Sequence, residues 1–380
     1  MPFRRKILSY ADARTKARRR LPRLIFDYID GAAGREEAAH RNEAAFDHVL
    51  LQPRALRNVA VRDLSTQLMG ETYDVPFGIA PMGMCNISDP KADQHLAGAA
   101  KAFNMPHCLS TVGSSNIEEL RGWAGENAWF QLYMGGKEAE ALALVDRAAA
   151  AGYRTLILTV DVPQVARRLR DVHNGFQMPF TIGPKQFFDF ATHPFWSIPM
   201  ALNGAPQPRN FIDENGKNTL DRGASRAGAD WNFLDRLRAH WTGNLLVKGV
   251  MSTEDAKRIV AAGADGVIVS NHGGRQLGGS PAALTMLPRI RAALGDGPVV
   301  CFDSGLRGGE DIVKALALGA DFVFLGRPLL MAMGAAGAAG LTEYLESIRE
   351  EVSLTMAQIG VTAIDQINSD VLAEAMADDG

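Results

Sequence analysis

The chain has 380 residues, which is enough for one large domain or two domains of ordinary size. Hydrophobic residues make up 47% of the sequence and charged residues 22%, a composition typical of globular proteins and not of disordered chains. The formal net charge of −3 gives no basic field that would attract nucleic acid, so a nucleic-acid partner is not predicted.

The cysteines point away from a secreted, disulfide-bonded protein. There are three of them, Cys85, Cys108 and Cys301, without a CxxC spacing, and an odd number argues against a disulfide framework. The N-terminal residues lack the apolar stretch of a signal peptide, and the longest apolar segment, residues 328–341, is too short to span a bilayer. We therefore expect a cytoplasmic location, with peripheral contact to the inner face of the cytoplasmic membrane still open, and no metal site.

Residues 1–74 precede the first predicted strand, and we expect them to form helices that cap the main fold. The rest of the chain alternates short apolar runs with segments of helical spacing, such as 137–151, 253–262 and 309–318. Several runs are nearly continuous in Val, Ile, Leu and Phe, as in strands covered on both faces. The eight predicted strands are residues 75–81, 105–111, 127–133, 155–161, 245–250, 266–272, 298–304 and 321–326. Eight β-then-α units predict an α/β fold, the (β/α)8 TIM barrel.

A long insert, residues 173–228, separates the fourth and fifth predicted strands. A loop of this length inside a compact domain is usually functional or disordered. Its aromatic residues argue against simple disorder, and they are Phe176, Phe180, Phe187, Phe188, Phe190, Phe195 and Trp196. We therefore expect an ordered insert within a single domain that covers residues 1–380.

The predicted strands become polar or charged where they end. In a (β/α)8 barrel these carboxyl ends build the active site. A histidine near a carboxylate suits a general base, and arginines suit a carboxylate or a phosphate. The glycine-rich turns 305–309 and 326–327 offer backbone N–H groups to a phosphate. Two anion sites and one base predict a phosphorylated cofactor and an acidic substrate.

The segment 270–276, Ser-Asn-His-Gly-Gly-Arg-Gln, resembles the signature of the FMN-dependent 2-hydroxy-acid oxidoreductases. That family includes glycolate oxidase, L-lactate dehydrogenase and mandelate dehydrogenase. The resemblance extends from about Tyr10 to Ile367, and further motifs follow in the family's order at 26–28, 130–133, 158–161, 247–249 and 325–327. It implies an enzyme that uses FMN to oxidise an L-2-hydroxy acid to the 2-oxo acid.

The resemblance also implies which residues bind FMN. Lys248 would lie near flavin N1, where a positive charge stabilises the reduced ring. The other contacts to the ring and ribityl chain would come from Ala80, Pro81, Met82, Gly83, Ser110, Gln131, Thr159 and Ser270. The phosphate would lie on Asp303, Ser304, Gly305, Arg307, Gly326 and Arg327, with Arg307 as its direct charge partner.

Four residues are implied as substrate contacts. Tyr28, Arg168 and Arg275 would hold the carboxylate, and Tyr133 would form a hydrogen bond near the hydroxyl group. Taken alone, Arg168 could be a surface residue of a helix, and Tyr28 could simply pack. In the family pattern, Arg275 and Tyr133 also count as catalytic residues.

His272 is implied as the catalytic base, with Asp161 stabilising the imidazolium. Alone, Asp161 could be a helix N-cap, but its place after an apolar run favours the catalytic role. The Cα hydrogen would leave as a hydride to flavin N5, and a carbanion route with the same base stays open.

Two departures from glycolate oxidase, Gly83 and Val112, favour the bacterial respiratory lactate and mandelate dehydrogenases. Residues 176–215 resemble the insert of these respiratory dehydrogenases, which is associated with the membrane. The resemblance therefore implies quinone as the electron acceptor. A lid or an oligomer contact is the alternative role for this segment. The resemblance also implies a homo-oligomer, a tetramer.

Three other functions compete with this interpretation. One is an oxidase of 2-hydroxy acids that passes electrons to oxygen. Another is a different FMN barrel enzyme, related to the type 2 isopentenyl diphosphate isomerase or to IMP dehydrogenase. The last is a non-catalytic flavin-binding protein, which would not need His272, Asp161, Arg168 and Arg275 together.

Overall fold

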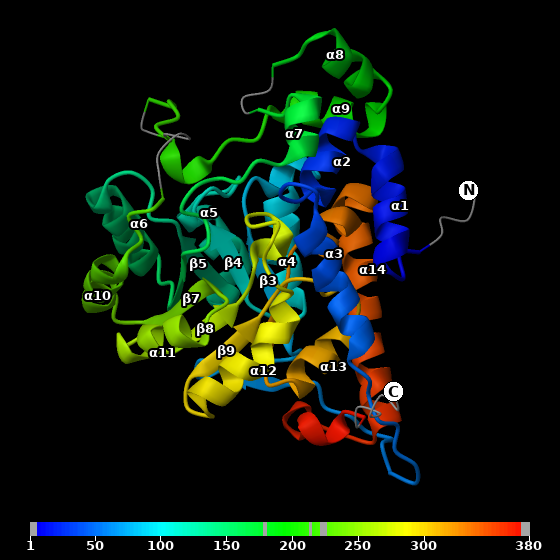
Figure 1. The fold of residues 1–380 in the computed structure, drawn as a ribbon. Helices are drawn as coiled ribbons and strands as arrows, with labels where there is room; N and C mark the ends of the chain where they lie inside the picture. The colour runs from blue at the N-terminus through cyan, green and yellow to red at the C-terminus, as the bar shows by residue number, and fades with distance from the viewer. Residues whose placement is uncertain (1–5, 178–180, 213–214, 221–225, 374–380) are drawn as a thin grey trace.

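Eight parallel strands close into a barrel in the computed structural model, which describes residues 6–177, 181–212, 215–220 and 226–373 (Figure 1). The barrel confirms the predicted (β/α)8 fold, and neighbouring strands follow one another in the order β10-β3-β4-β5-β6-β7-β8-β9. The strands are β3 (Phe77–Met82), β4 (His107–Ser110), β5 (Ala128–Leu132), β6 (Thr155–Thr159), β7 (Asn244–Val250), β8 (Gly266–Val269), β9 (Val299–Phe302) and β10 (Phe322–Leu325).

The barrel strands bury side chains on both faces, which explains their continuous apolar runs. All five residues of β6 are buried. Ile157 packs with Leu246 and Ile268 inside the barrel, whereas Leu156 and Leu158 belong to the larger core outside it. Each such side chain contributes about 1.5–3 kcal/mol by its burial.

Helices surround the barrel, and each predicted helical segment is confirmed by one of them. Residues 137–151 contain α6 (Glu138–Ala150), 253–262 contain α11 (Thr253–Ala261) and 309–318 contain α13 (Gly309–Ala317). The other helices after the strands are α4 (Ala92–Ala102), α5 (Ile117–Ala124), α10 (Trp231–His240), α12 (Ala283–Leu294) and α14 (Arg327–Ile359).

The N-terminal segment forms the expected capping helices, α1 (Tyr10–Arg20), α2 (Arg23–Asp30) and α3 (Glu37–Ala44). Helix α1 packs along α14, and α3 packs on the turn that follows β8 (Figure 1). A hairpin that was not predicted, β1 (Thr66–Leu68) and β2 (Glu71–Tyr73), adds Leu68 and Tyr73 to the core inside the barrel. Strands of three residues are too short to show a periodic pattern.

The insert between β6 and β7 is helical where the structure describes it. Helices α7 (Leu169–Asn174), α8 (Pro184–Ala191) and α9 (Pro194–Asn203) lie at the end of the molecule near α2 (Figure 1). The indole of Trp196 is buried and donates to the carbonyl of Ile87 at 2.8 Å. Asp189 accepts from the backbone N–H groups of Arg23 and Leu24, so α8 is tied to the start of α2. Phe180, one of the predicted aromatics, lies outside the described residues.

The apolar segment 328–341 forms the first part of α14, which bends at Ala336 and Gly337. No helix among the residues described here has the length and apolar character needed to cross a membrane. Cys85, Cys108 and Cys301 are buried free thiols, as expected from their apolar surroundings.

Candidate active site

The carboxyl ends of the strands surround a cavity with about 1270 Å³ of free space, which includes space open to solvent. We call this cavity the rim pocket. The predicted site residues that line it are Tyr28, Ala80, Pro81, Met82, Gly83, Tyr133, Arg168, Lys248, His272, Arg275, Asp303, Ser304, Gly305, Arg307, Gly326 and Arg327. The other predicted residues are not among its lining residues, and they are Ser110, Gln131, Thr159, Asp161 and Ser270.

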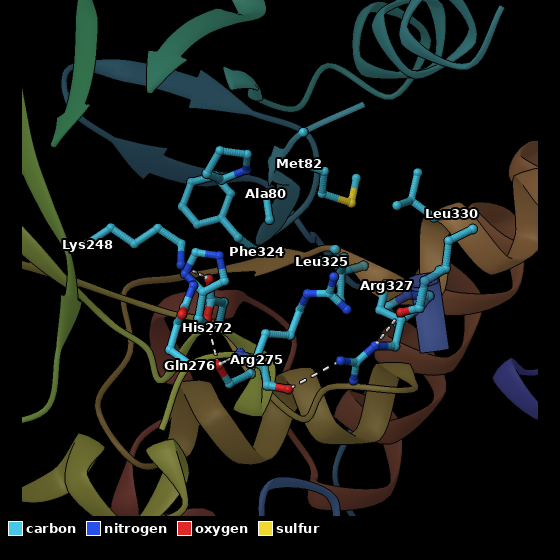
Figure 2. Close-up of a pocket in the computed structure, with 18 of the residues that line it drawn as sticks. Ala80, Met82, Lys248, His272, Arg275, Gln276, Phe324, Leu325, Arg327 and Leu330 are labelled. Atoms are coloured by element: carbon cyan, nitrogen blue, oxygen red, sulfur yellow. Dashed lines mark hydrogen bonds and ion pairs between the residues drawn. The ribbon is translucent and has the colours of Figure 1, made fainter. Parts of the chain in front are cut away.

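His272 lies in a strained turn after β8 and points into the rim pocket (Figure 2). Its φ is 59°, in the left-handed region that non-glycine residues seldom adopt. The backbone N–H of His272 donates to Ser270 Oγ at 3.0 Å, and that of Gly273 donates to Ser304 Oγ at 3.0 Å. These contacts stabilise a backbone conformation that costs free energy but directs the imidazole at the cavity.

Asp161 holds the other side of the imidazole. Its Oδ1 lies 3.0 Å from His272 Nδ1, so Nε2 is the ring nitrogen left to exchange a proton in the pocket. Burial alone would raise the pKa of Asp161, but His272 and Lys248 lower it below its usual value. Asp161 is therefore an anion at neutral pH. Gly249 has a φ of 101°, and a Cβ there would lie 2.5 Å from Asp161 Cβ, so only glycine leaves room for this carboxylate.

Lys248 is buried at the wall of the same pocket. Its Nζ lies 2.9 Å from Asp303 Oδ2 and donates to Ser270 Oγ at 2.9 Å. Burial alone would lower the pKa of Lys248, but Asp303 and Asp161 raise it above its ordinary value. Lys248 therefore carries a positive charge, and Figure 2 shows it projecting toward the same space as His272.

Arg275, Arg168 and Tyr28 form the substrate end of the rim pocket. Arg275 donates to the carbonyls of Tyr28 and Gly31 at 2.9 and 2.7 Å. Both guanidinium groups lie near the Tyr28 ring, Arg275 at 5.2 Å and Arg168 at 5.3 Å from its centroid. Burial lowers the pKa of Arg275, and the charge of Arg168 lowers it further. A bound carboxylate would relieve this repulsion, so the geometry favours an anionic ligand.

Arg307 and Arg327 form the phosphate end. Arg307 lies 2.6 Å from Glu43 and stacks on the Tyr10 ring at 4.5 Å, and its Nε is buried without a partner among the described residues. Arg327 donates to the carbonyl of Ile29 at 3.0 Å. Burial lowers the pKa of Arg327, as does the charge of Arg307. Two half-buried cations that repel each other fit a doubly charged phosphate.

Residues 17–374 match the family model of FMN-dependent dehydrogenases. The chain belongs to this family. It is 36% identical over 384 residues to an L-lactate dehydrogenase of Pseudomonas syringae pv. syringae (strain B728a), covering 98% of this chain and all of the relative. It is 38% identical to the (S)-mandelate dehydrogenase of Pseudomonas putida, covering 96% of this chain and 94% of that one. A crystal structure described as the monotopic membrane protein (S)-mandelate dehydrogenase superimposes with a TM-score of 0.94 at 37% identity, over 98% of this chain and 100% of that chain.

FMN is the cofactor of this family, and the buried polar atoms of the site fit it. At the ends of β5 and β6, Gln131 Nε2 and Thr159 Oγ1 are buried and have no hydrogen-bond partner within the described part of the chain. Gln131 Oε1 accepts from Ser110 Oγ at 3.1 Å, which leaves the amide nitrogen as a donor for a ligand. Unpaired buried polar groups are costly, and the hydrogen-bonding edge of a flavin would satisfy them.

Asp303 differs from the other residues predicted for the phosphate. Its carboxylate binds Lys248 and accepts from Ser304 Oγ at 2.8 Å. A carboxylate repels a phosphate, so the structure gives the Asp303 side chain the task of holding Lys248. Its backbone begins the turn at Ser304 and Gly305, whose φ values are 88° and 98°.

Several residues of this dehydrogenase site escaped the sequence reasoning. Asp171 pairs with Arg168 at 3.0 Å, and Glu43 pairs with Arg307. Phe176 stacks on Tyr28 with ring centroids 4.1 Å apart. Arg226 stacks over the Tyr133 ring at 4.4 Å. Only Asp171 had a signal, its i+3 spacing from Arg168 at the start of α7.

Proposed function

We propose that this chain oxidises an L-2-hydroxy acid to the corresponding 2-oxo acid with FMN. The observation that carries the proposal is the placement of the His272–Asp161 pair in one pocket with Arg275 and Arg168. A base and an excess of cations in one cavity suit a substrate with a hydroxyl group beside a carboxylate. The names of the similar L-lactate and (S)-mandelate dehydrogenases support the same class of substrate.

The carboxylate would bind Arg275 and Arg168, with the Tyr28 hydroxyl as a further donor. Arg168 now pairs with Asp171, and a substrate carboxylate would compete with that pairing. The half-buried guanidinium of Arg275 has no such competitor, because it donates to backbone carbonyls and forms no ion pair with the described residues. Arg275 is therefore the main anchor, and it fixes the position of the reacting carbon.

His272 Nε2 would accept the hydroxyl proton, and the Asp161 carboxylate would stabilise the imidazolium that forms. Tyr133 would hydrogen-bond the hydroxyl region. Burial raises the pKa of Tyr133 to about 12, so its hydroxyl remains a donor at neutral pH. When bound, FMN supplies the acceptor for the two electrons that leave the substrate. His272 is the base whether the Cα hydrogen departs as a hydride or as a proton.

The FMN ring would be held by Gln131, Thr159 and Lys248, and its phosphate by Arg307 and Arg327. The unpartnered Gln131 Nε2 and Thr159 Oγ1 support the first assignment, and the mutual repulsion of the two arginines supports the second. In these positions Lys248 stabilises negative charge on the ring.

Anaerobic mixing tests this proposal. Lactate or mandelate added to the FMN-loaded protein should bleach the absorbance of the oxidised flavin. The L enantiomer should act and the D enantiomer should not. If no 2-hydroxy acid bleaches the flavin, one of the other FMN barrel functions is favoured.

We also propose that α8 and α9 attach the protein to a membrane surface, where a quinone would accept the electrons. Five large apolar side chains of these helices are exposed, Phe187, Phe188, Phe195, Ile198 and Leu202. Phe195 and Leu202 are 80% and 82% exposed. Exposed apolar patches of this kind mark interaction surfaces, and aromatic residues on helices suit the membrane interface. The similarity to a structure described as a monotopic membrane protein supports this proposal.

Point variants test the attachment better than removal of residues 176–215. Such a deletion would also remove Phe176 from Tyr28 and the buried Trp196. Replacing Phe187, Phe188 and Phe195 by serine should abolish co-sedimentation with phospholipid vesicles and leave the activity in solution intact. The control replaces Leu56 and Val61, which are fully or largely exposed elsewhere. If the serine variant and the Leu56/Val61 control sediment with vesicles to the same extent, the proposed attachment through α8 and α9 is wrong.

A further inference from the structure

Arg226 lies at the wall of the rim pocket and has no role in the function proposed so far. It stands near the end of the insert, four residues before the N-cap of α10. Its backbone N–H donates to the carbonyl of Pro163 at 3.1 Å, which ties it to the loop after β6. Its guanidinium lies 4.4 Å from the centroid of the Tyr133 ring. A half-buried cation is thus placed on the face of a predicted substrate contact.

Among the residues that the structure describes, no acidic side chain pairs with Arg226. Of the other cations at the pocket, Arg168 pairs with Asp171, Arg307 with Glu43 and Lys248 with Asp303. Arg275 and Arg327 donate to backbone carbonyls instead. The Arg226 guanidinium forms no ion pair and no side-chain hydrogen bond with any residue that the structure describes. Its contact with the Tyr133 ring contributes only about 0.5–2 kcal/mol and satisfies none of its N–H donors.

Arg226 is also separate from the arginines that would hold the reacting carboxylate. The charges of Arg168 and Arg327 lower the pKa of Arg275, whereas the charge of Arg226 lowers the pKa of Tyr133. The pocket therefore offers a cationic position beside Tyr133 in addition to the one at Tyr28. A substrate whose carboxylate is bound at Arg275 would lie in the pocket that Tyr133 and Arg226 also line.

We propose that Arg226 binds a second carboxylate at the far end of the substrate, so that the preferred substrates are 2-hydroxy dicarboxylic acids. The inference rests on the proposed oxidation of 2-hydroxy acids at this pocket. Arginine binds a carboxylate through two parallel hydrogen bonds, and such a pair is specific as well as strong. Val112 and Val165 line the same pocket, and their apolar side chains would suit the carbon chain between the two carboxylates.

A purely positioning role for Arg226 makes a different prediction. If its guanidinium only orients the Tyr133 ring, its removal slows the oxidation of every 2-hydroxy acid by the same factor. If it binds a second carboxylate, its removal affects only substrates that carry one. Matched substrates with and without that group separate the two roles.

The experiment compares (S)-2-hydroxyglutarate with (S)-2-hydroxypentanoate on the FMN-loaded protein. The two acids have the same carbon chain and differ in the distal carboxylate. The wild type should have the higher kcat/KM with the dicarboxylate. Arg226→Met should lower that value about 10- to 100-fold, mainly through KM, because a charged hydrogen bond is lost. It should leave the value for (S)-2-hydroxypentanoate within about 2-fold, because that acid carries no second carboxylate for Arg226 to bind.

Two further variants sharpen the result. Arg226→Lys should restore part of the preference, since a lysine keeps the charge but not the paired donors. Arg167→Met removes an exposed arginine outside the pocket and should change neither substrate. As a readout independent of turnover, 2-oxoglutarate should perturb the flavin spectrum at lower concentration than 2-oxopentanoate, and Arg226→Met should remove that difference.

Four outcomes would overturn the inference. Equal losses with both acids would leave Arg226 a positioning residue for Tyr133. Unchanged kinetics with both acids would show that it contacts no substrate. If (S)-2-hydroxypentanoate bleaches the flavin and the dicarboxylate does not, the proposed oxidation stands and the second-carboxylate site fails. If no 2-hydroxy acid bleaches the flavin, both fail together.

Discussion

The two ends of the rim pocket both bind anions, but they are built differently. At the phosphate end, Arg307 is held by Glu43 and Tyr10 and Arg327 by the carbonyl of Ile29, all from the N-terminal segment. At the substrate end, Arg168 stands at the start of α7 in the insert and is already paired with Asp171.

This difference follows from how long each ligand stays. A cofactor phosphate remains bound, so its site can include a cation such as Arg327, which forms no ion pair with the described residues, beside Arg307, which pairs with Glu43. A substrate carboxylate must leave after every turnover. Asp171 offers Arg168 an internal partner in its absence, which limits the cost of an empty site.

The largest effect is expected at the base. His272→Ala should slow anaerobic reduction of the flavin by at least about 10²- to 10⁴-fold, because the hydroxyl proton then has no acceptor. The FMN content should stay that of the wild type, since His272 belongs to the substrate end. Rapid-mixing absorbance measures the rate, and His173→Ala, at an exposed histidine, is the control. Near-normal reduction by the His272 variant would remove it from the chemistry.

Arg307→Met should weaken FMN binding and leave the turnover of the FMN-bound enzyme unchanged. The phosphate loses a buried charge partner, so FMN affinity should fall about 10- to 100-fold. Turnover per bound FMN should remain close to that of the wild type, because the substrate end is intact. Equilibrium dialysis and activity at saturating FMN check the two parts. Loss of turnover per FMN with normal affinity would contradict the separation of the ends.

The stability of the fold should depend on pH through Asp30. Asp30 binds Arg14 at 2.7 Å and Arg170 at 2.7 Å. Burial alone would raise its pKa, but these arginines lower it from 3.8 to about 2. The native state therefore favours the ionised form, and its contribution to stability is complete above pH 4 and is lost as the pH falls to about 2.

Unfolding by urea checks this expectation. At neutral pH, Asp30→Asn should lower the free energy of unfolding by about 1–2 kcal/mol, a value reduced because Arg14 is partly exposed. The difference from the wild type should shrink between pH 4 and 2. A difference that is constant over this range would mean that the carboxylate charge does not contribute.

The smallest effect is expected at Asp171. If its carboxylate competes with the substrate for Arg168, Asp171→Asn should lower KM by about 2- to 5-fold, as expected for loss of a partly exposed ion pair. The value of kcat should change little. A higher KM in this variant would show that Asp171 orients Arg168 for the substrate, and the two ends would then be more alike than we infer.

The sequence predicted the barrel well because parallel strands covered on both faces leave continuous apolar runs. It placed most strand ends too late, however, although β7 ends at the predicted residue and β3 ends one residue later than predicted. Residues 266–272 were expected to form one strand, but β8 ends at Val269 and His272 lies in a left-handed turn. The serine hydroxyls of Ser270 and Ser304 stabilise that turn, and side chains from two different loops leave no local pattern.

The residues of the candidate site could be predicted from the sequence, but most of the contacts between their side chains could not. The pairing of Asp161 with His272 was expected from the family pattern, and the structure places them 3.0 Å apart. The pairing of Lys248 with Asp303 was not expected, because it joins two strand ends distant in sequence. Nor could the exposed face of the insert be foreseen, since the same aromatic residues could have been buried together.

The most direct test of the account is the stoichiometry of one anaerobic turnover. The FMN-loaded protein is mixed with an L-2-hydroxy acid in the absence of oxygen and quinone, and the 2-oxo acid is quantified against the flavin bleached. We predict equal amounts of 2-oxo acid and reduced FMN. Bleaching without 2-oxo acid, or no bleaching with any 2-hydroxy acid, would contradict the account.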